Sequence, residues 1–247
     1  PFCNIYSTFM QRAYDNVIHD VAIQDLPVVM CLDRGGLVGE DGVTHHGVFD
    51  MAAFAPVPGL TIAAPMDERE LRNMMYTAFR FGHPFMIRYP RGCGEGVAWR
   101  GAAFEALPVG RGRCLREGCD VAVLSIGTVG NAAARAVGRA SGEGVQAAHY
   151  DLRFVKPLDE TLLDEVGRRF RHVVTVEDGA LRGGVGEAVA AFFNERGYDV
   201  RVESLGIGDQ WVEHGTPAQL HALCGYDEES ILRALLEAGR SSCACGA

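Results

Sequence analysis

The stretch YSTFMQRAYD (residues 6–15) follows an apolar run, FCNI (residues 2–5), and starts a segment whose apolar residues recur at helical intervals. This pattern predicts a strand that turns directly into an amphipathic helix. Ligands of open α/β sheets bind at the carboxyl ends of strands, so Tyr6 and Phe9 are expected at such an edge. The strand-like start at Pro1 predicts a cut, a processing point or the start of the ordered chain.

Predicted strands and helices alternate through the first half of the chain. Thr8 and Gln11 have the spacing of a capping box before a helix that continues to about residue 21. Asp67 and Glu70 mark the start of a second helix that runs to about residue 79. Apolar runs predict further strands at 28–32, 61–64 and 85–89, and the nearly unbroken run at 28–32 is typical of a parallel strand covered on both faces.

A second α/β series follows a Gly- and Arg-rich stretch at 92–120, which is the best candidate for a domain boundary. Strands are predicted at 121–126, 145–150, 173–176 and 200–205, and helices at 130–140, 159–169, 185–196 and 227–238. The fold class is therefore α/β, with two successive domains of mainly parallel sheets flanked by helices. We expect domains at 1–110, with the linker from about 92, and at 120–238, followed by a disordered tail at 239–247.

Composition limits the classes of function. The formal net charge of 23 − 32 = −9 argues weakly against nucleic-acid binding, and no apolar run is long enough to span a membrane. Eight scattered cysteines indicate reduced thiols and a cytoplasmic protein rather than a disulfide framework. Cys243 and Cys245 lack the partner ligands of a zinc site, and no metal site is predicted within the chain.

Two arginines occupy equivalent positions after apolar strands. Arg34 and Arg91 each precede a glycine, so both are expected at the sheet edge that carries Tyr6, with Arg12 and Arg88 nearby in sequence. Guanidinium groups bind phosphate or carboxylate through two parallel hydrogen bonds, which favours an anion site. The alternative is that each arginine caps a strand or pairs with a surface carboxylate.

The loop around 39–47 carries the candidate acid–base groups. Its glycines permit close approach to a ligand. A histidine such as His45 can exchange a proton near neutral pH, and Asp41 can orient that histidine or bond a hydroxyl. A solvated loop without catalytic function is the alternative. Phe9 could stack on a flat heterocycle or belong to the core. The GGVG turn at 183–186 suggests a phosphate cradle, but close strand–helix packing explains it better.

The combination of several stretches resembles the 1-deoxy-D-xylulose-5-phosphate synthases, members of the transketolase-like, thiamine-diphosphate-dependent family. The stretches are IYSTFMQRAYDNVIHDVAIQ (5–24), LDRGGLVGEDGVTHHGVFDM (32–51), IRYPRG (87–92), RFVKPLDE (153–160) and TVED (175–178). The resemblance covers nearly all of residues 1–238. It implies a truncated pyrimidine-binding domain followed by the transketolase C-terminal domain.

The resemblance also implies an activity, a transferase reaction that condenses pyruvate with D-glyceraldehyde 3-phosphate to 1-deoxy-D-xylulose 5-phosphate and CO₂, for isoprenoid precursors and thiamine. Thiamine diphosphate and Mg²⁺ are the implied cofactors. The ligands of the diphosphate and the metal are expected in an N-terminal domain outside this sequence. The glutamate that activates the aminopyrimidine is expected shortly upstream of Pro1, so the fragment alone is expected to be inactive. A homodimer is implied as well.

Residue by residue, the resemblance assigns seven side chains to the site. They are Tyr6, Arg34 and Arg91 on the aldehyde's phosphate, Asp41 and His45 on substrate oxygens with His45 handling the proton, and Phe9 and Arg12 on the aminopyrimidine side. His46 receives no role. Two alternatives remain: a separate subunit of a split transketolase-like enzyme, whose N-terminal domain is another chain, and a non-catalytic α/β binding module.

Overall fold

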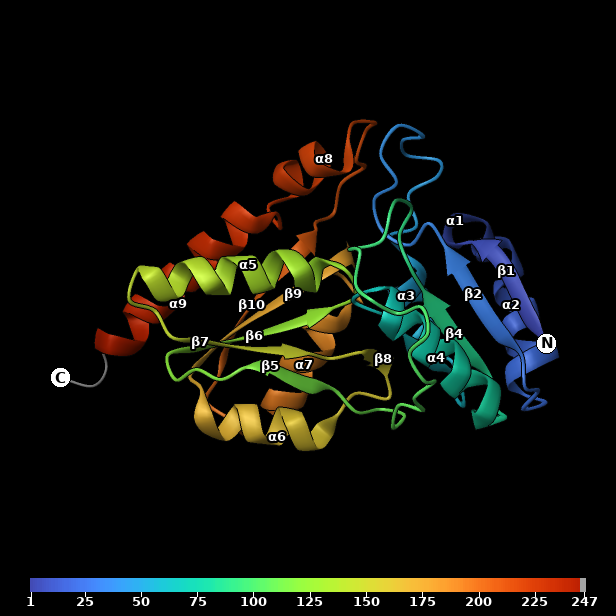
Figure 1. The fold of residues 1–247 in the computed structure, drawn as a ribbon, viewed down its shortest axis with the longest axis horizontal. Helices are drawn as coiled ribbons and strands as arrows, with labels where there is room; N and C mark the ends of the chain where they lie inside the picture. The colour runs from blue at the N-terminus through green and yellow to red at the C-terminus, as the bar shows by residue number, and fades with distance from the viewer. Residues whose placement is uncertain (245–247) are drawn as a thin grey trace.

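Two sheets lie at opposite ends of the molecule, and helices flank each of them (Figure 1). The computed structural model describes the backbone of residues 1–244 and the side chains of residues 1–240. The strand order is β1-β2-β4-β3-β8 in the first sheet and β10-β9-β6-β7-β5 in the second. All neighbouring strands are parallel except the pairs β3–β8 and β5–β7, so the predicted α/β class with mainly parallel sheets is confirmed.

The elements keep the alternation expected from the sequence. The strands are β1 (Phe2–Tyr6), β2 (Val29–Asp33), β3 (Thr61–Ala63), β4 (Phe85–Arg88), β5 (Arg113–Arg116), β6 (Val121–Ile126), β7 (Ala147–Asp151), β8 (Phe154–Lys156), β9 (His172–Ala180) and β10 (Arg201–Ile207). The α-helices are α1 (Ser7–Met10), α2 (Tyr14–Asn16), α3 (Asp50–Phe54), α4 (Glu68–Phe81), α5 (Val129–Gly142), α6 (Glu160–Arg169), α7 (Val185–Glu195), α8 (Pro217–Cys224) and α9 (Glu228–Ala244). No described helix combines the length and apolar character that crossing a membrane requires.

The helix starts show one prediction confirmed and one wrong. Asp67 caps α4 by accepting a hydrogen bond from the Glu70 amide at 2.8 Å, as its spacing predicts. The capping box at Thr8 does not form, because the Thr8 hydroxyl donates to the carbonyl of Thr44 at 3.0 Å instead. The segment after β1 is also not one continuous helix. A 3₁₀ turn at Gln11–Ala13 separates the short α1 from α2, and a π-helix at Val17–Ala22 follows α2.

The second sheet is covered on both faces. Side chains alternate along β6, so Val121 and Val123 pack in the core with α5 and α9, while Ala122 and Leu124 pack on the face that carries α6 and α7. Figure 1 shows these two helix pairs on opposite sides of the sheet. Such two-sided burial explains why the strand is a continuous apolar run.

The two halves of the chain are joined more closely than two domains in series. β8 leaves the second half and adds to the first sheet beside β3, where Ile62 pairs with Lys156 and Ala63 with Phe154. One hydrophobic cluster then continues across both sheets. The predicted boundary segment itself contains β5, an edge strand of the second sheet.

Helix α9 extends into the stretch for which the sequence predicts a disordered tail. Helix α9 continues to Ala244. Gly239 is buried, and Val145 leaves no space for a side chain at this position. The absence of a side chain at Gly239 is therefore a packing requirement. Cys245 and the side chain of Cys243 lie outside the described residues. Cys3, Cys31, Cys93, Cys114 and Cys224 are free thiols.

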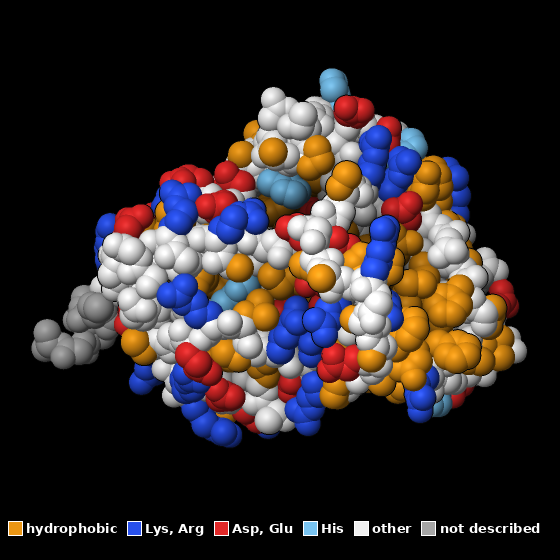
Figure 2. Space-filling view, in the orientation of Figure 1, with side chains coloured by type: hydrophobic (Ala, Val, Ile, Leu, Met, Phe, Trp, Pro, Cys, Tyr) orange, Lys and Arg blue, Asp and Glu red, His pale blue; other side chains and the backbone are white. Residues whose placement is uncertain are grey.

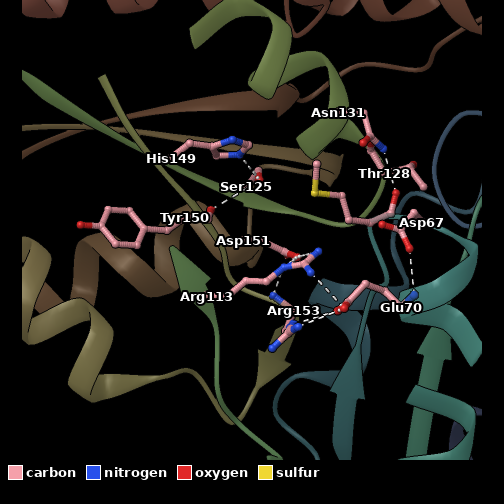
Figure 3. Close-up of polar contacts among 11 residues, drawn as sticks. Asp67, Glu70, Arg113, Ser125, Thr128, Asn131, His149, Tyr150, Asp151 and Arg153 are labelled. Atoms are coloured by element: carbon pink, nitrogen blue, oxygen red, sulfur yellow. Dashed lines mark hydrogen bonds and ion pairs between the residues drawn. The ribbon is translucent and has the colours of Figure 1, made fainter. Parts of the chain in front are cut away.

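A cluster of charged side chains connects the two halves of the chain (Figure 3). Glu70 of α4 accepts hydrogen bonds from Arg113 at 3.0 Å and Arg153 at 2.8 Å, and Arg113 also contacts Asp151 at 3.0 Å. Asp151 is fully buried, and burial raises its pKa from 3.8 to about 6 despite the nearby arginines.

A polar pair next to that cluster joins β6 to β7. Ser125 Oγ is 2.8 Å from His149 Nε2, and the histidine is 1% exposed (Figure 3). Burial, with a smaller contribution from the Arg113 charge, lowers the pKa of His149 from 6.5 to about 4. β7 therefore carries one acid and one imidazole whose pKa values move in opposite directions.

Candidate active site

The carboxyl ends of three adjacent parallel strands form one rim. In β1, β2 and β4 the register pairs Tyr6 with Asp33 and Leu32 with Arg88, so the chain leaves all three strands at the same level. Arg34 follows β2 directly, and Arg91 comes three residues after the end of β4. The predicted convergence of Tyr6 with Arg34 and Arg91 is what the structure shows.

Arg34 is the central member of this rim. Its backbone adopts a left-handed φ of 62°, and its guanidinium carbon lies 4.1 Å from the centroid of the Tyr6 ring. The same guanidinium donates to Asp41 Oδ2 at 2.6 Å, and Arg91 donates to that oxygen at 3.2 Å. One carboxylate oxygen from the predicted loop therefore joins the two arginines.

Close backbone contacts hold the loop that carries Asp41. Gly36 and Gly47 exchange backbone hydrogen bonds of 2.8 Å at the base of the loop. A β-carbon at Gly47 would lie 2.2 Å from the Arg34 carbonyl oxygen, so the position requires glycine. The loop is thereby closed over the rim beside Arg34.

An aromatic group continues the site toward α1. Phe9 stacks on Tyr6 with centroids 5.6 Å apart and meets the His45 ring edge-on at 5.5 Å. The Arg12 guanidinium lies 5.6 Å from the Phe9 centroid. All seven predicted site residues therefore form one connected group, and Phe9 is part of it rather than of the buried core.

The two adjacent histidines have different surroundings. His45 Nδ1 lies 2.9 Å from the Thr44 hydroxyl within the site. His46 is buried, accepts a hydrogen bond from the Val38 amide at 3.1 Å through Nδ1, and contacts the Glu213 carbonyl at 3.4 Å through Nε2. Both ring nitrogens of His46 thus support the loop.

A cavity of about 390 Å³ opens beside the arginines. Arg34 and Arg91 line it together with Tyr89 and the acidic Glu68, whose carboxylate accepts from the Gly96 amide at 2.8 Å. Within the described residues, no group of three or more His, Cys, Asp or Glu side chains could hold a metal ion. The side chains of the rim thus suit an anion and a flat ring.

Comparison with known proteins places this arrangement in a family. Residues 1–95 match the transketolase pyrimidine-binding domain and residues 110–231 match the transketolase C-terminal domain. The chain belongs to the transketolase-like family. It is 60% identical over 239 residues to 1-deoxy-D-xylulose-5-phosphate synthase of Bacteroides thetaiotaomicron and 46% identical over 238 residues to the synthase of Chlorobaculum tepidum. The resemblance to these synthases is confirmed.

These alignments cover 96% of this chain. The chain therefore spans 37% of the length of either relative. Among solved structures it is similar to a split gene transketolase, an inactive beta4 tetramer, with a TM-score of 0.84 and 26% identity over 97% of this chain and 76% of that one. A transketolase mutant from Pichia stipitis shares the fold with a TM-score of 0.75 and 16% identity over 98% of this chain and 34% of the other.

Behind the rim, this transketolase-like chain buries an arginine that the sequence did not distinguish from its neighbours. Arg88 is 5% exposed and contacts Asp50 Oδ2 at 2.9 Å and the Asp178 carbonyl at 2.9 Å. Burial lowers its pKa, but the Asp50 and Asp178 charges outweigh this effect, so the net pKa is raised. Arg88 thus belongs to the junction, although it stands at the end of β4 like a site arginine.

Asp178 extends this junction into the second half of the chain. Its Oδ1 accepts from the Leu37 amide at 3.0 Å and from the Tyr226 hydroxyl at 2.8 Å. Burial, and then the Asp178 charge, raises the pKa of Tyr226. A residue of the transketolase pyrimidine-binding domain, Leu37, thus lies against the carboxyl end of β9, where an open sheet usually binds ligands.

The GGVG turn has a structural function in this transketolase-like chain. The amides of Val185 and Gly186 at the start of α7 donate to the Glu177 carboxylate at 2.9 and 2.8 Å. A β-carbon at Gly186 would lie 2.3 Å from Ser204 Oγ. An internal carboxylate therefore fills the anion position of this helix, and close packing explains the glycines, as predicted.

Proposed function

We propose that this chain forms the pyrimidine-binding and C-terminal domains of a 1-deoxy-D-xylulose-5-phosphate synthase. The complete enzyme is a transferase that joins pyruvate to D-glyceraldehyde 3-phosphate and releases CO₂, for isoprenoid precursors and thiamine, in the cytoplasm. The observation that carries this proposal is the convergence of Tyr6, Arg34 and Arg91 on one rim. The identity of about 60% to a synthase supports it.

The rim is suited to a phosphate monoester. Arg34 and Arg91 present two guanidinium groups within reach of a single oxygen, which is the geometry that a tetrahedral dianion requires. The Tyr6 ring holds the Arg34 guanidinium in place through a cation–π contact. We assign the aldehyde's phosphate to these three side chains.

His45 and Asp41 are proposed to act on substrate oxygens. The Thr44 hydroxyl engages Nδ1 of His45, which leaves Nε2 as the nitrogen that exchanges a proton with the substrate. Asp41 is proposed to accept a hydrogen bond from a substrate hydroxyl. The contact with Phe9 fixes the plane of the imidazole.

Phe9 and Arg12 fit the aminopyrimidine side of a thiamine cofactor. Phe9 is half-buried and its neighbours Tyr6, His45 and Arg12 make an aromatic and cationic surface suited to a flat nitrogen heterocycle. When bound, thiamine diphosphate would supply the electron sink for decarboxylation. Its diphosphate and Mg²⁺ are proposed to bind an N-terminal domain of the same or another chain, within a homodimer.

An exposed apolar face supports the proposed partner domain. Phe79 and Phe104 are 71% and 60% exposed, and with Phe2 and Met75 they line a groove of about 570 Å³ along α4. Figure 2 shows hydrophobic side chains gathered on the side of the molecule where Figure 1 places α4 and β4. Contiguous apolar surface of this kind marks a contact with another protein surface.

Steady-state kinetics of the complete enzyme test the phosphate assignment. Arg34→Ala and Arg91→Ala are each expected to raise KM for D-glyceraldehyde 3-phosphate by at least about tenfold more than KM for pyruvate, because only the aldehyde carries a phosphate. Equal effects on both substrates would remove the assignment. The exposed Arg171→Ala serves as the matched control, and the 247-residue chain alone is expected to form no product.

A second candidate is a separate subunit of a split transketolase-like enzyme. The similarity to a split gene transketolase, which extends over 97% of this chain, favours it. The gene sequence upstream of the Pro1 codon decides between the two. A continuous reading frame into a magnesium motif and a glutamate-bearing strand excludes the two-chain enzyme.

A further inference from the structure

The carboxylate of Asp41 lies where an anionic ligand of the two arginines would bind. Its Oδ2 is 2.6 Å from Arg34 and 3.2 Å from Arg91. Two cations and one carboxylate leave a formal charge of +1 on the three side chains. A phosphate bound between the arginines would bring its oxygens beside this carboxylate, and like charges so close repel each other. Phosphate and Asp41 therefore cannot both occupy the arginines.

The arginines have supports that do not depend on Asp41. Arg34 lies over the Tyr6 ring at 4.1 Å, and Arg91 also donates to the Val38 carbonyl at 3.4 Å. Among the described residues, the Asp41 carboxylate accepts its side-chain hydrogen bonds from the two guanidinium groups. Asp41 is thus the member of the trio that can leave while the other two stay in position.

Solvent reaches all three side chains, so a solute can displace one of them. The side chains of Arg34, Asp41 and Arg91 are 21%, 33% and 42% exposed. Such partly exposed ion pairs are individually weak, which makes their exchange for a stronger anion favourable. A phosphate dianion bonds both arginines bidentately and neutralises both charges, whereas Asp41 offers them one oxygen.

We propose that Asp41 is a displaceable internal counter-ion, which occupies the phosphate site of the free protein and leaves it when a phosphate monoester binds. This proposal rests on the proposed function and adds a step to it. Displacement frees the Asp41 carboxylate, in the same loop as His45, to accept a hydrogen bond from a substrate hydroxyl. Anion binding and the positioning of Asp41 are thereby coupled.

Occupation by Asp41 lowers the apparent affinity of every anion by the same factor, because binding requires the fraction of molecules whose arginines are free. Removing the carboxylate should therefore strengthen anion binding, although it removes a polar residue from the site. A residue that positions the arginines would show the opposite effect. This difference in direction makes the proposal testable without turnover.

The test is calorimetric titration of the protein with inorganic phosphate and, separately, with acetate. Asp41→Asn is expected to bind both anions about tenfold more tightly than the unsubstituted protein. Glu40→Gln, the adjacent exposed residue, removes the same charge without touching either arginine and is the matched control. Arg34→Ala and Arg91→Ala are expected to abolish the binding of phosphate.

Unchanged or weaker phosphate binding by Asp41→Asn overturns the proposal, and so does an equal gain in Glu40→Gln, which would indicate a general charge effect. If the arginine variants still lose phosphate, the phosphate assignment stands although the counter-ion proposal fails. Phosphate binding that is insensitive to the arginines, or absent from every variant, removes both. A circular dichroism spectrum of each variant confirms that it is folded.

Discussion

The opposite pKa shifts of Asp151 and His149 predict that two large effects on stability cancel in this protein. Asp151 has a pKa of about 6 in the folded chain against an ordinary 3.8, and His149 has a pKa of about 4 against 6.5. Both side chains are on β7 at the junction (Figure 3), so neither can escape burial while the second sheet is folded.

Between pH 4 and pH 6 the folded state keeps the Asp151 proton that the unfolded chain has released. Its contribution to the free energy of unfolding therefore falls by about 1.4 kcal/mol for each pH unit as the pH rises. His149 acts in reverse, since the unfolded chain holds a proton that the folded state lacks, and its contribution rises by a similar amount. Across the window each effect reaches about 3 kcal/mol.

Substitution of either residue should expose the other effect. Relative to the unsubstituted protein, Asp151→Asn should steepen the rise of unfolding free energy from pH 4 to pH 6 by about 3 kcal/mol in total. His149→Gln should reduce the rise of unfolding free energy from pH 4 to pH 6 by the same amount. The double variant should return to the original pH dependence, although its stability at any one pH will be lower.

Urea unfolding followed by circular dichroism at constant ionic strength measures these slopes. The slope against pH, rather than the absolute stability, is the quantity compared, so packing defects of the variants do not enter. Three parallel curves for the protein and its two single variants would refute the reasoning. Chemical shifts of the His149 ring between pH 4 and pH 7 give an independent value for its pKa.

Two further predictions concern the loop and the junction. Gly47→Ala should lower the free energy of unfolding by about 1–3 kcal/mol, because the new β-carbon would meet the Arg34 carbonyl at 2.2 Å; Gly138→Ala in α5, with open space around it, should be neutral or slightly stabilising. Equal effects in urea unfolding would contradict the close contact. Asp50→Ala should cost about 3–5 kcal/mol, since it leaves the charge of Arg88 buried without its partner. Asp199→Ala removes a largely exposed ion pair and should cost less than about 1 kcal/mol by the same assay, and a similar loss in both variants would argue against a buried pair.

Much of this site follows from sequence because parallel strands end at one edge. The apolar run before Arg34 and the run before Arg91 both predict strands, and Tyr6 follows a third, so their meeting needs no knowledge of side-chain packing. The same reasoning cannot separate Arg88 from Arg91. Arg88 ends β4 and Arg91 follows three residues later, and the contacts of Arg88 with Asp50 and with Asp178, ninety residues later in the chain, show that Arg88 is buried.

Contacts between distant segments account for the remaining differences. β8 has three residues and no periodic signal, and its place beside β3 depends on the packing of the two halves. The Thr8 hydroxyl has the spacing of a cap, but the Thr44 carbonyl competes for it. Gly239 looks unfavourable for packing in the sequence because it has no side chain, whereas a glycine is what the close contact with Val145 requires.

The position of bound phosphate is the most direct test of the central claim. A crystal structure of the complete enzyme with D-glyceraldehyde 3-phosphate should place the phosphate oxygens within hydrogen-bonding distance of both Arg34 and Arg91, with Asp41 withdrawn from them. A phosphate held elsewhere, with the two arginines still paired to Asp41, would contradict the account.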